Sequence, residues 1–142
     1  MNGFQYLHSN NIMHRDFKLA NIFLDNDTCV IGDLGFAKEV ESETGTRLGT
    51  PVYMAPEILN LQFGDTYSTK SDLWSIGIVF FQMLTNKLPY NGWMVGEKEF
   101  KRELLEKSGP NLKFPNDIDI SDASKDLLRQ LLTYDPTKRI EI

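Results

Sequence analysis

Four side chains that could act on a phosphate and its metal ion stand close together in the sequence. Asp16, Lys18 and Asn21 lie within six positions, and Asp33 follows after a short, mainly apolar stretch. Carboxylate and amide oxygens are ligands that a hard cation such as Mg²⁺ prefers, and an ammonium group offsets the charge of a phosphate. Phosphoryl transfer needs positioning and charge neutralisation more than covalent assistance. These residue types suit that chemistry if the fold brings them together.

Three motifs surround these residues in a fixed order. The stretch His14–Asn21 matches the pattern H-R-D-x-x-x-x-N. A second motif, D-F-G, usually follows that pattern, and here Asp33–Gly35 stands in its place, with Leu instead of Phe. Ala55–Glu57 then supplies A-P-E. A lone His-Arg-Asp tripeptide is weak evidence, but three motifs in this order are specific. From these residues through to Arg139, the chain resembles the C-terminal lobe of a eukaryotic-type serine/threonine protein kinase.

The resemblance implies a role for each candidate residue. Asp16 would accept the proton of the substrate hydroxyl, or orient that hydroxyl, and Lys18 would lie near the γ-phosphate of the nucleotide. Asn21 and Asp33 would hold Mg²⁺, and Asp33 and Lys18 would both contact the nucleotide. Phe23 matches the apolar side chain beneath the adenine, where the family usually has Leu. The implied phosphate donor is ATP and the implied cofactor is Mg²⁺.

A protein substrate is also implied. A Lys two positions after the Asp is typical of serine/threonine kinases, so the acceptors would be Ser and Thr hydroxyls. Thr50 resembles the residue that hydrogen bonds the catalytic Asp and Lys in these kinases. With Pro51 and Val52 it would line the site for the substrate residue that follows the acceptor.

Residues 33–57 would form the activation segment. They hold few periodic apolar positions and many Gly, Thr, Ser and Glu, which predicts a long loop. Arg15, beside the predicted catalytic Asp, needs an anion when it is buried, and a phosphate on this loop would supply one. Thr46 lies four residues before Thr50. In this family, that position is usually the primary phosphorylation site of the loop. We expect phosphorylation of Thr46 to order the loop.

Other matching residues would support the site. Glu57 and Arg139 would form a buried ion pair between the end of the activation segment and the helical core. Asp72 would accept backbone N–H groups of the catalytic loop. His14 and Leu34 would stack in an apolar column that is complete in the active state.

The remaining pattern predicts a mostly helical α+β lobe with a small β-hairpin. The hairpin joins residues 22–24 to residues 29–31. Residues 69–85 are apolar on nearly every face, which indicates a buried helix. Residues 95–107 form an amphipathic helix, and Ser121 caps a third.

Composition narrows the class of protein. The chain has 142 residues, which fits one domain, and its net charge of −5 argues against a nucleic-acid partner. Cys29 is the only cysteine, so a reducing, intracellular (cytoplasmic) setting is expected; we expect it to be a small buried strand residue. We interpret His8 as a hydrogen-bonded residue at a helix end. The most apolar segment, residues 73–84, is shorter than the roughly 20 residues that span a bilayer.

The sequence lacks the motifs that mark the N-terminal lobe of a kinase. No G-x-G-x-x-G occurs, and only 13 residues precede His14, which leaves no room for the strand that carries the nucleotide-binding Lys. We expect that lobe upstream, and we expect the 142-residue chain alone to be nearly inactive. The activation segment and the rest of residues 1–142 would then be a partial protein kinase domain.

Two alternatives remain open. The chain could be a non-catalytic protein-interaction module derived from a kinase C-terminal lobe, although such a module has no need to keep all four chemical residues. It could also be a small-molecule kinase related to the aminoglycoside phosphotransferases, which lack the Ala55–Glu57 segment and its Arg139 partner. Within the kinases, the stretches Asp33–Lys38, Tyr53–Glu57 and Asp72–Gly77 look most like the autophagy-initiating group.

Overall fold

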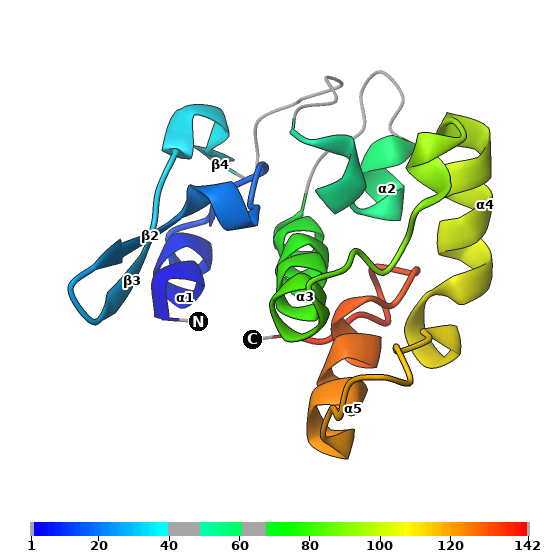
Figure 1. Cartoon of the computed structure of the whole chain (residues 1–142). Helices are drawn as coiled ribbons and strands as arrows, with labels where there is room; N and C mark the ends of the chain where they lie inside the picture. Colours follow the sequence, from blue (N-terminus) through cyan, green and yellow to red (C-terminus); the bar gives the residue numbers. More distant parts are fainter. Residues whose placement is uncertain (1, 40–48, 61–67, 142) are drawn as a thin grey trace.

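Helices predominate over short strands in this α+β structure (Figure 1). The computed structural model describes residues 2–39, 49–60 and 68–141. Its helices are α1 (Asn2–Ser9), α2 (Pro56–Leu59), α3 (Thr69–Thr85), α4 (Glu97–Lys107) and α5 (Asp122–Leu131). Its strands are β1 (Ile12–Met13), β2 (Ile22–Asp25), β3 (Thr28–Ile31) and β4 (Lys38–Glu39). Short 3₁₀ turns are η1 (Leu19–Asn21), η2 (Leu34–Phe36), η3 (Pro51–Tyr53), η4 (Gly92–Met94) and η5 (Gly109–Asn111).

The predicted hairpin is present as β2 and β3. The two strands pair antiparallel with Phe23 opposite Val30, and Asn26 at their turn has the left-handed φ of 52° that a tight hairpin turn favours. Most of the hairpin is exposed, including Cys29. The expectation that Cys29 is buried was wrong, because a two-stranded ribbon leaves most of its side chains to solvent.

A second pair of strands links the two main motifs. Strand β1 pairs antiparallel with β4, so that Met13 lies opposite Lys38. Each strand has only two residues, too few for an alternating pattern to be visible in the sequence. The pairing joins the chain just before His14–Asn21 to the chain just after Asp33–Gly35. The segment that we expected to be a long loop therefore begins with ordered structure.

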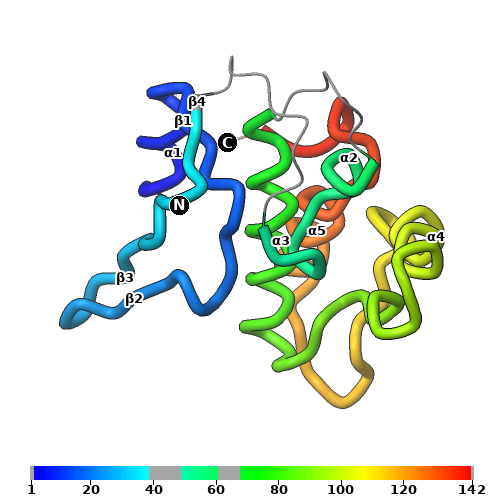
Figure 2. Tube along the Cα trace, turned by 90° about the horizontal axis from the view of Figure 1, so that it is seen from above, coloured from blue at the N-terminus to red at the C-terminus, as the bar shows by residue number. Residues whose placement is uncertain are grey.

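Helix α3 lies at the centre of the molecule. In both views it separates α1 and the β2–β3 hairpin from α4 and α5 (Figures 1 and 2). Eleven of its 17 residues are buried, which confirms the prediction of a helix buried on nearly every face. The His14–Asn21 motif packs against one side of α3.

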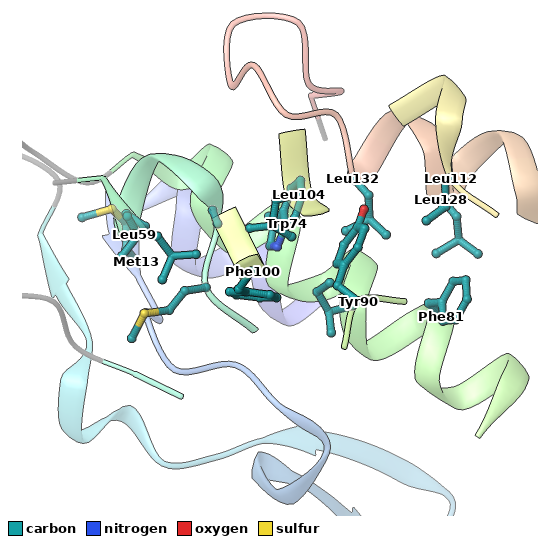
Figure 3. Close-up of a cluster of buried hydrophobic side chains, with 14 residues drawn as sticks. Met13, Leu59, Trp74, Phe81, Tyr90, Phe100, Leu104, Leu112, Leu128 and Leu132 are labelled. Atoms are coloured by element: carbon teal, nitrogen blue, oxygen red, sulfur yellow. The ribbon is translucent and has the colours of Figure 1, made fainter. Parts of the chain in front are cut away.

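Two hydrophobic clusters pack on opposite sides of α3. The larger cluster joins it to α2, α4 and α5 (Figure 3) and includes Trp74, Ile78, Phe81, Phe100, Leu104, Leu128 and Leu132. The second joins it to α1 and to the chain after β1, and includes Phe4, Phe17, Leu73, Ile76 and Val79. Gly77 permits the close approach of α5, because a Cβ at this position would lie only 2.8 Å from the Leu132 side chain.

The other helices follow the predicted order. Helix α4 begins at Glu97 rather than Val95, because η4 and then Gly96, with a φ of 151°, precede it. Ser121 caps α5 as predicted, its Oγ accepting from the Ser124 N–H at 3.2 Å. Within residues 2–39, 49–60 and 68–141, no helix is both long and apolar enough to cross a membrane.

One ion pair ties α2 to the C-terminal end of the described chain. Arg139 Nη1 and Nη2 donate to Glu57 Oε1 and Oε2 at 2.7 and 2.9 Å. The Arg139 side chain is fully buried, and it also donates to the carbonyls of Lys70 and Thr133. One guanidinium group therefore holds the start of α3, the region after α5 and the Ala55–Glu57 motif together.

We predict that Arg139→Met lowers the free energy of unfolding by about 3 kcal/mol, because Glu57 and the carbonyls of Lys70, Thr133 and Tyr134 lose their buried donor. Urea unfolding followed by circular dichroism measures this loss. Lys138→Met is the matched control, since the Lys138 ammonium pairs with Asp135 at 3.5 Å and both side chains are exposed. Equal stability of the two variants would contradict a structural role for the buried pair.

Candidate active site

The predicted catalytic loop contains a strained turn that a buried carboxylate holds in place. Arg15 has a φ of 69°, a left-handed conformation that costs a non-glycine residue roughly 1–2 kcal/mol. The N–H groups of His14 and Arg15 donate to Asp72 Oδ2 and Oδ1 at 2.9 and 3.0 Å. Asp72 lies in the first turn of α3 and is only 2% exposed. Two charge-assisted hydrogen bonds thus offset the strain and fix the backbone next to Asp16.

Asp16, Lys18 and Thr50 form one hydrogen-bonded group. Lys18 Nζ lies 2.7 Å from Asp16 Oδ2 and 3.0 Å from Thr50 Oγ1. Asp16 Oδ1 accepts from both the N–H and the hydroxyl of Thr50, at 2.9 and 3.1 Å. The Asp16 side chain is 5% exposed and that of Lys18 is 26% exposed. A buried carboxylate is therefore held in a fixed direction beside a partly exposed ammonium group.

Gly49 allows the distant Thr50 to reach this group. It has a φ of 115°, and a Cβ at this position would stand 2.7 Å from the carbonyl oxygen of Arg15. Both the backbone angle and the close approach require glycine here. The close approach therefore explains why glycine precedes Thr50 in the predicted activation segment.

Asn21 lies on the other side of the Asp16 backbone. Its Nδ2 donates to the Asp16 carbonyl at 2.8 Å, and the residue is 4% exposed. This bond identifies which atom of the side-chain amide is the nitrogen. The other atom, the amide oxygen, remains available to bind a cation. The Asn21 carbonyl accepts from the N–H of Gly32 at 2.9 Å, while the His14 ring nitrogen Nε2 lies 3.0 Å from the Gly32 carbonyl. Asp33, the next residue, is therefore anchored beside the loop.

The donor set fits Mg²⁺ in chemical type. Asn21 offers an amide oxygen, and Asp33 offers an exposed carboxylate on a backbone with a φ of 57°. Hard oxygen ligands of this kind, completed by water and phosphate oxygens, are typical of magnesium sites at nucleotides. In the described ranges, no three His, Cys, Asp or Glu side chains cluster as they would around a protein-only metal site.

Residues predicted to contact the nucleotide and substrate are exposed or half-buried. Phe23 is 53% exposed, and its ring covers Gly32, where a Cβ would meet it at 2.4 Å. Pro51 and Val52 are half-buried in η3, which Ser75 of α3 fixes by donating to the Tyr53 carbonyl at 2.9 Å. These roles stay predictions, but the residues lie on segments that adjoin the Asp16 group.

Two expectations are not tested by the contacts of the described residues. Leu34 is 50% exposed, whereas His14 is fully buried and packs against the rings of Phe4 and Phe17; the predicted apolar column stays a prediction. Thr46, the predicted phosphorylation site, lies outside the described residues.

A large apolar hollow of the described chain does not contain the residues of the predicted chemistry. It is mostly apolar, has a volume of about 1010 Å³, and lies between α1, the hairpin, α3 and α5. Its lining includes Phe17 and Leu34 but none of Asp16, Lys18, Asn21 and Asp33. The polar group that could act on a phosphate lies instead where the catalytic loop meets the Gly49–Thr50 segment.

Sequence reasoning did not identify the partner of one residue in the supporting network. His8 Nε2, at the end of α1, lies 3.0 Å from Asp72 Oδ2. The expectation of a hydrogen-bonded residue at a helix end is confirmed, and the partner lies 64 positions away in the sequence. No pattern in the sequence indicated that pairing.

Comparison with known proteins agrees with this geometry. The sequence profile described as protein kinase domain matches residues 1–142. Serine/threonine-protein kinase ATG1b of Arabidopsis thaliana is 39% identical, with 97% of this chain and 19% of the relative covered. Serine/threonine-protein kinase 33 of Bos taurus is 40% identical, with 95% and 29% covered. Protein kinase C delta type of Homo sapiens is 38% identical, with 100% and 20% covered.

The chain thus spans between 19% and 29% of the length of these three relatives. An ATG1 kinase is among them, beside kinases with other names at similar identity. The matched profile covers the whole chain, including every residue of the hydrogen-bonded group around Asp16. The chain belongs to the protein kinase family.

Proposed function

We propose that this chain is the C-terminal catalytic lobe of a serine/threonine protein kinase, which transfers the γ-phosphate of ATP to Ser and Thr hydroxyls of proteins. The observation that carries the proposal is the group formed by Asp16, Lys18 and Thr50, in which Lys18 Nζ lies 2.7 Å from one carboxylate oxygen and 3.0 Å from the Thr50 hydroxyl. A serine/threonine relative at 39% identity supports the choice of acceptor.

Asp16 would act on the acceptor hydroxyl. Its Oδ1 is held by Thr50, so the carboxylate has one orientation and a low entropic cost of alignment. The hydroxyl oxygen attacks the γ-phosphorus, the bond from that phosphorus to the leaving oxygen of ADP breaks, and Asp16 accepts the hydroxyl proton. Lys18, partly exposed beside Asp16, would turn its ammonium group toward the phosphate and offset the charge that moves to the leaving group.

Asn21 and Asp33 would hold Mg²⁺, which when bound neutralises phosphate charge. Asn21 suits this role because its Nδ2 is tied to the Asp16 carbonyl at 2.8 Å, which orients the amide oxygen. The exposed ring of Phe23 would cover one face of the adenine. Pro51 and Val52, on the rigid η3 turn, would contact the substrate residue after the acceptor, and Glu57 with Arg139 would anchor the segment that follows.

We predict that Asp16→Asn lowers kcat by about 10²- to 10⁴-fold, the range for loss of a positioned base. Transfer of ³²P to a Ser/Thr peptide mixture is measured with the chain alone and with the chain fused behind the region that precedes the matched segment in the Arabidopsis relative. The chain alone is expected to be nearly inactive. Asp25→Asn, in the exposed hairpin, is the matched control. A fusion that binds protein partners but transfers no phosphate in either variant would favour the non-catalytic module instead.

We predict that Thr50→Val lowers kcat about tenfold or more, because the hydroxyl that bridges Asp16 and Lys18 is worth roughly 1.5–3 kcal/mol as a bond to charged groups. Thr50→Ser keeps the hydroxyl and is expected to retain most activity. Steady-state kinetics of the fusion separates kcat from KM. Retained activity in Thr50→Val together with a loss in Thr50→Ser would show that the methyl group, and not the hydroxyl, is what matters.

We also propose that phosphorylation of Thr46 raises activity, with Arg15 as one partner of the phosphate. Mass spectrometry of active enzyme is expected to find phosphate on Thr46, and Thr46→Ala is expected to lower kcat. Thr44→Ala controls for a change in loop composition. Full activity of Thr46→Ala together with an unmodified Thr46 would rule out this form of control.

A further inference from the structure

We infer that Gly32 is a positioning residue for Phe23, and that the pair fixes an aromatic ring where the base of the nucleotide would lie. The place of the base rests on the proposed function, whereas the packing of the ring on Gly32 is a property of the structure itself. Gly32 immediately precedes Asp33, and Phe23 stands two positions after Asn21. The pair is therefore close in the chain to both predicted Mg²⁺ ligands.

Gly32 leaves space for the Phe23 ring that a residue with a side chain would fill. A Cβ placed on Gly32 would overlap Phe23 Cε2 and lie 2.7 Å from Phe23 Cδ2, whereas carbon atoms make favourable contact at about 3.5–4.0 Å. The backbone does not itself require a glycine here, because the φ of Gly32 lies outside the left-handed region. The packing of the ring is therefore the structural reason for this glycine.

A methyl group on residue 32 would displace the ring and not the backbone. The N–H of Gly32 donates to the Asn21 carbonyl at 2.9 Å, and the Gly32 carbonyl accepts from Nε2 of the buried His14 at 3.0 Å. Both polar groups of Gly32 are thus held in place. Phe23 is about half exposed on a two-stranded ribbon, so its ring has room to swing outward. Gly32 consequently decides where the ring lies.

The exposed part of the ring does not belong to the large apolar hollow. Ile22 and Ile31, which pair across the hairpin, line that hollow, but Phe23 does not. A ring that is held in one place, outside the hollow and on the segments that carry Asn21 and Asp33, suits the stacking of a planar base. We therefore expect this ring to contribute to the binding of the base and not to the binding of the phosphates.

Three variants separate the position of the ring from other effects of the substitutions. Gly32→Ala adds the methyl group that displaces the ring, Phe23→Leu removes the ring, and the double variant tests whether the two changes are coupled. Gly3→Ala is the matched control, because a Cβ on Gly3 meets the same hairpin at Ile31 Cδ1, 2.8 Å away, and does not contact Phe23.

Nuclear magnetic resonance of the full chain tests the position of the ring without any nucleotide. Nuclear Overhauser effects between the Phe23 ring protons and the α protons of residue 32 are expected in the starting protein and in Gly3→Ala, and are expected to be lost in Gly32→Ala. If Gly32→Ala does not fold, the double variant is expected to fold, because the smaller Leu leaves room for the methyl group. Retained contacts in a folded Gly32→Ala, or failure of both variants to fold, would overturn the inference.

Calorimetric titration of the fusion with ADP and Mg²⁺, and separately with adenosine, tests the role of the pair in binding. Gly32→Ala is expected to raise the Kd of both ligands by about three- to tenfold, the effect of losing one aromatic stacking contact. In the Phe23→Leu background the same substitution is expected to change either Kd by less than about twofold.

Two binding results would contradict the pairing of Gly32 with Phe23. An equal effect of Gly32→Ala in both backgrounds would show that residue 32 acts through the backbone and not through the ring. An effect on ADP without an effect on adenosine would show that it acts on the phosphates. If the starting fusion binds neither ligand, the proposed function fails, while the resonance experiment still decides whether Gly32 positions Phe23.

Discussion

The arrangement of the site depends on one buried carboxylate. Asp72 receives the backbone N–H groups of His14 and Arg15 and is nearly inaccessible to water. A charge in that position cannot be left without donors, so the catalytic loop must pass over the first turn of α3 in one particular shape. That constraint places Asp16 where Lys18 and Thr50 can reach it, and the proposed chemistry depends on it.

Electrostatic balance around Asp16 is achieved by segments far apart in the chain. Lys18 is two positions away, whereas Thr50 is 34 positions away and approaches only because Gly49 adopts a positive φ beside the Arg15 carbonyl. An ammonium, a hydroxyl and a backbone N–H together stabilise one buried carboxylate. Such preorganised donors favour catalysis because they need no rearrangement as the reaction proceeds. The arrangement also makes the site sensitive to the position of the segment around Thr50.

Helix α3 connects this chemistry to the stability of the whole chain. It carries Asp72 and Ser75 toward the site, and its two sides contact both hydrophobic clusters. The guanidinium group of Arg139 binds the carbonyl of Lys70 at the start of the same helix and the carboxylate of Glu57. The central helix therefore holds the catalytic loop, the η3 turn and the Ala55–Glu57 segment in one frame. A change that shifts α3 is expected to affect all three.

The sequence alone determined the family, because His14–Asn21, Asp33–Gly35 and Ala55–Glu57 are specific in composition, order and spacing. It also determined the hairpin and the buried helix α3, whose patterns are local and periodic. Only the tertiary structure decided which groups meet: His8 with Asp72 across 64 positions, and the two-residue strands β1 and β4. These contacts leave no periodic signal, since each depends on where long-range packing places a single side chain or a short backbone segment.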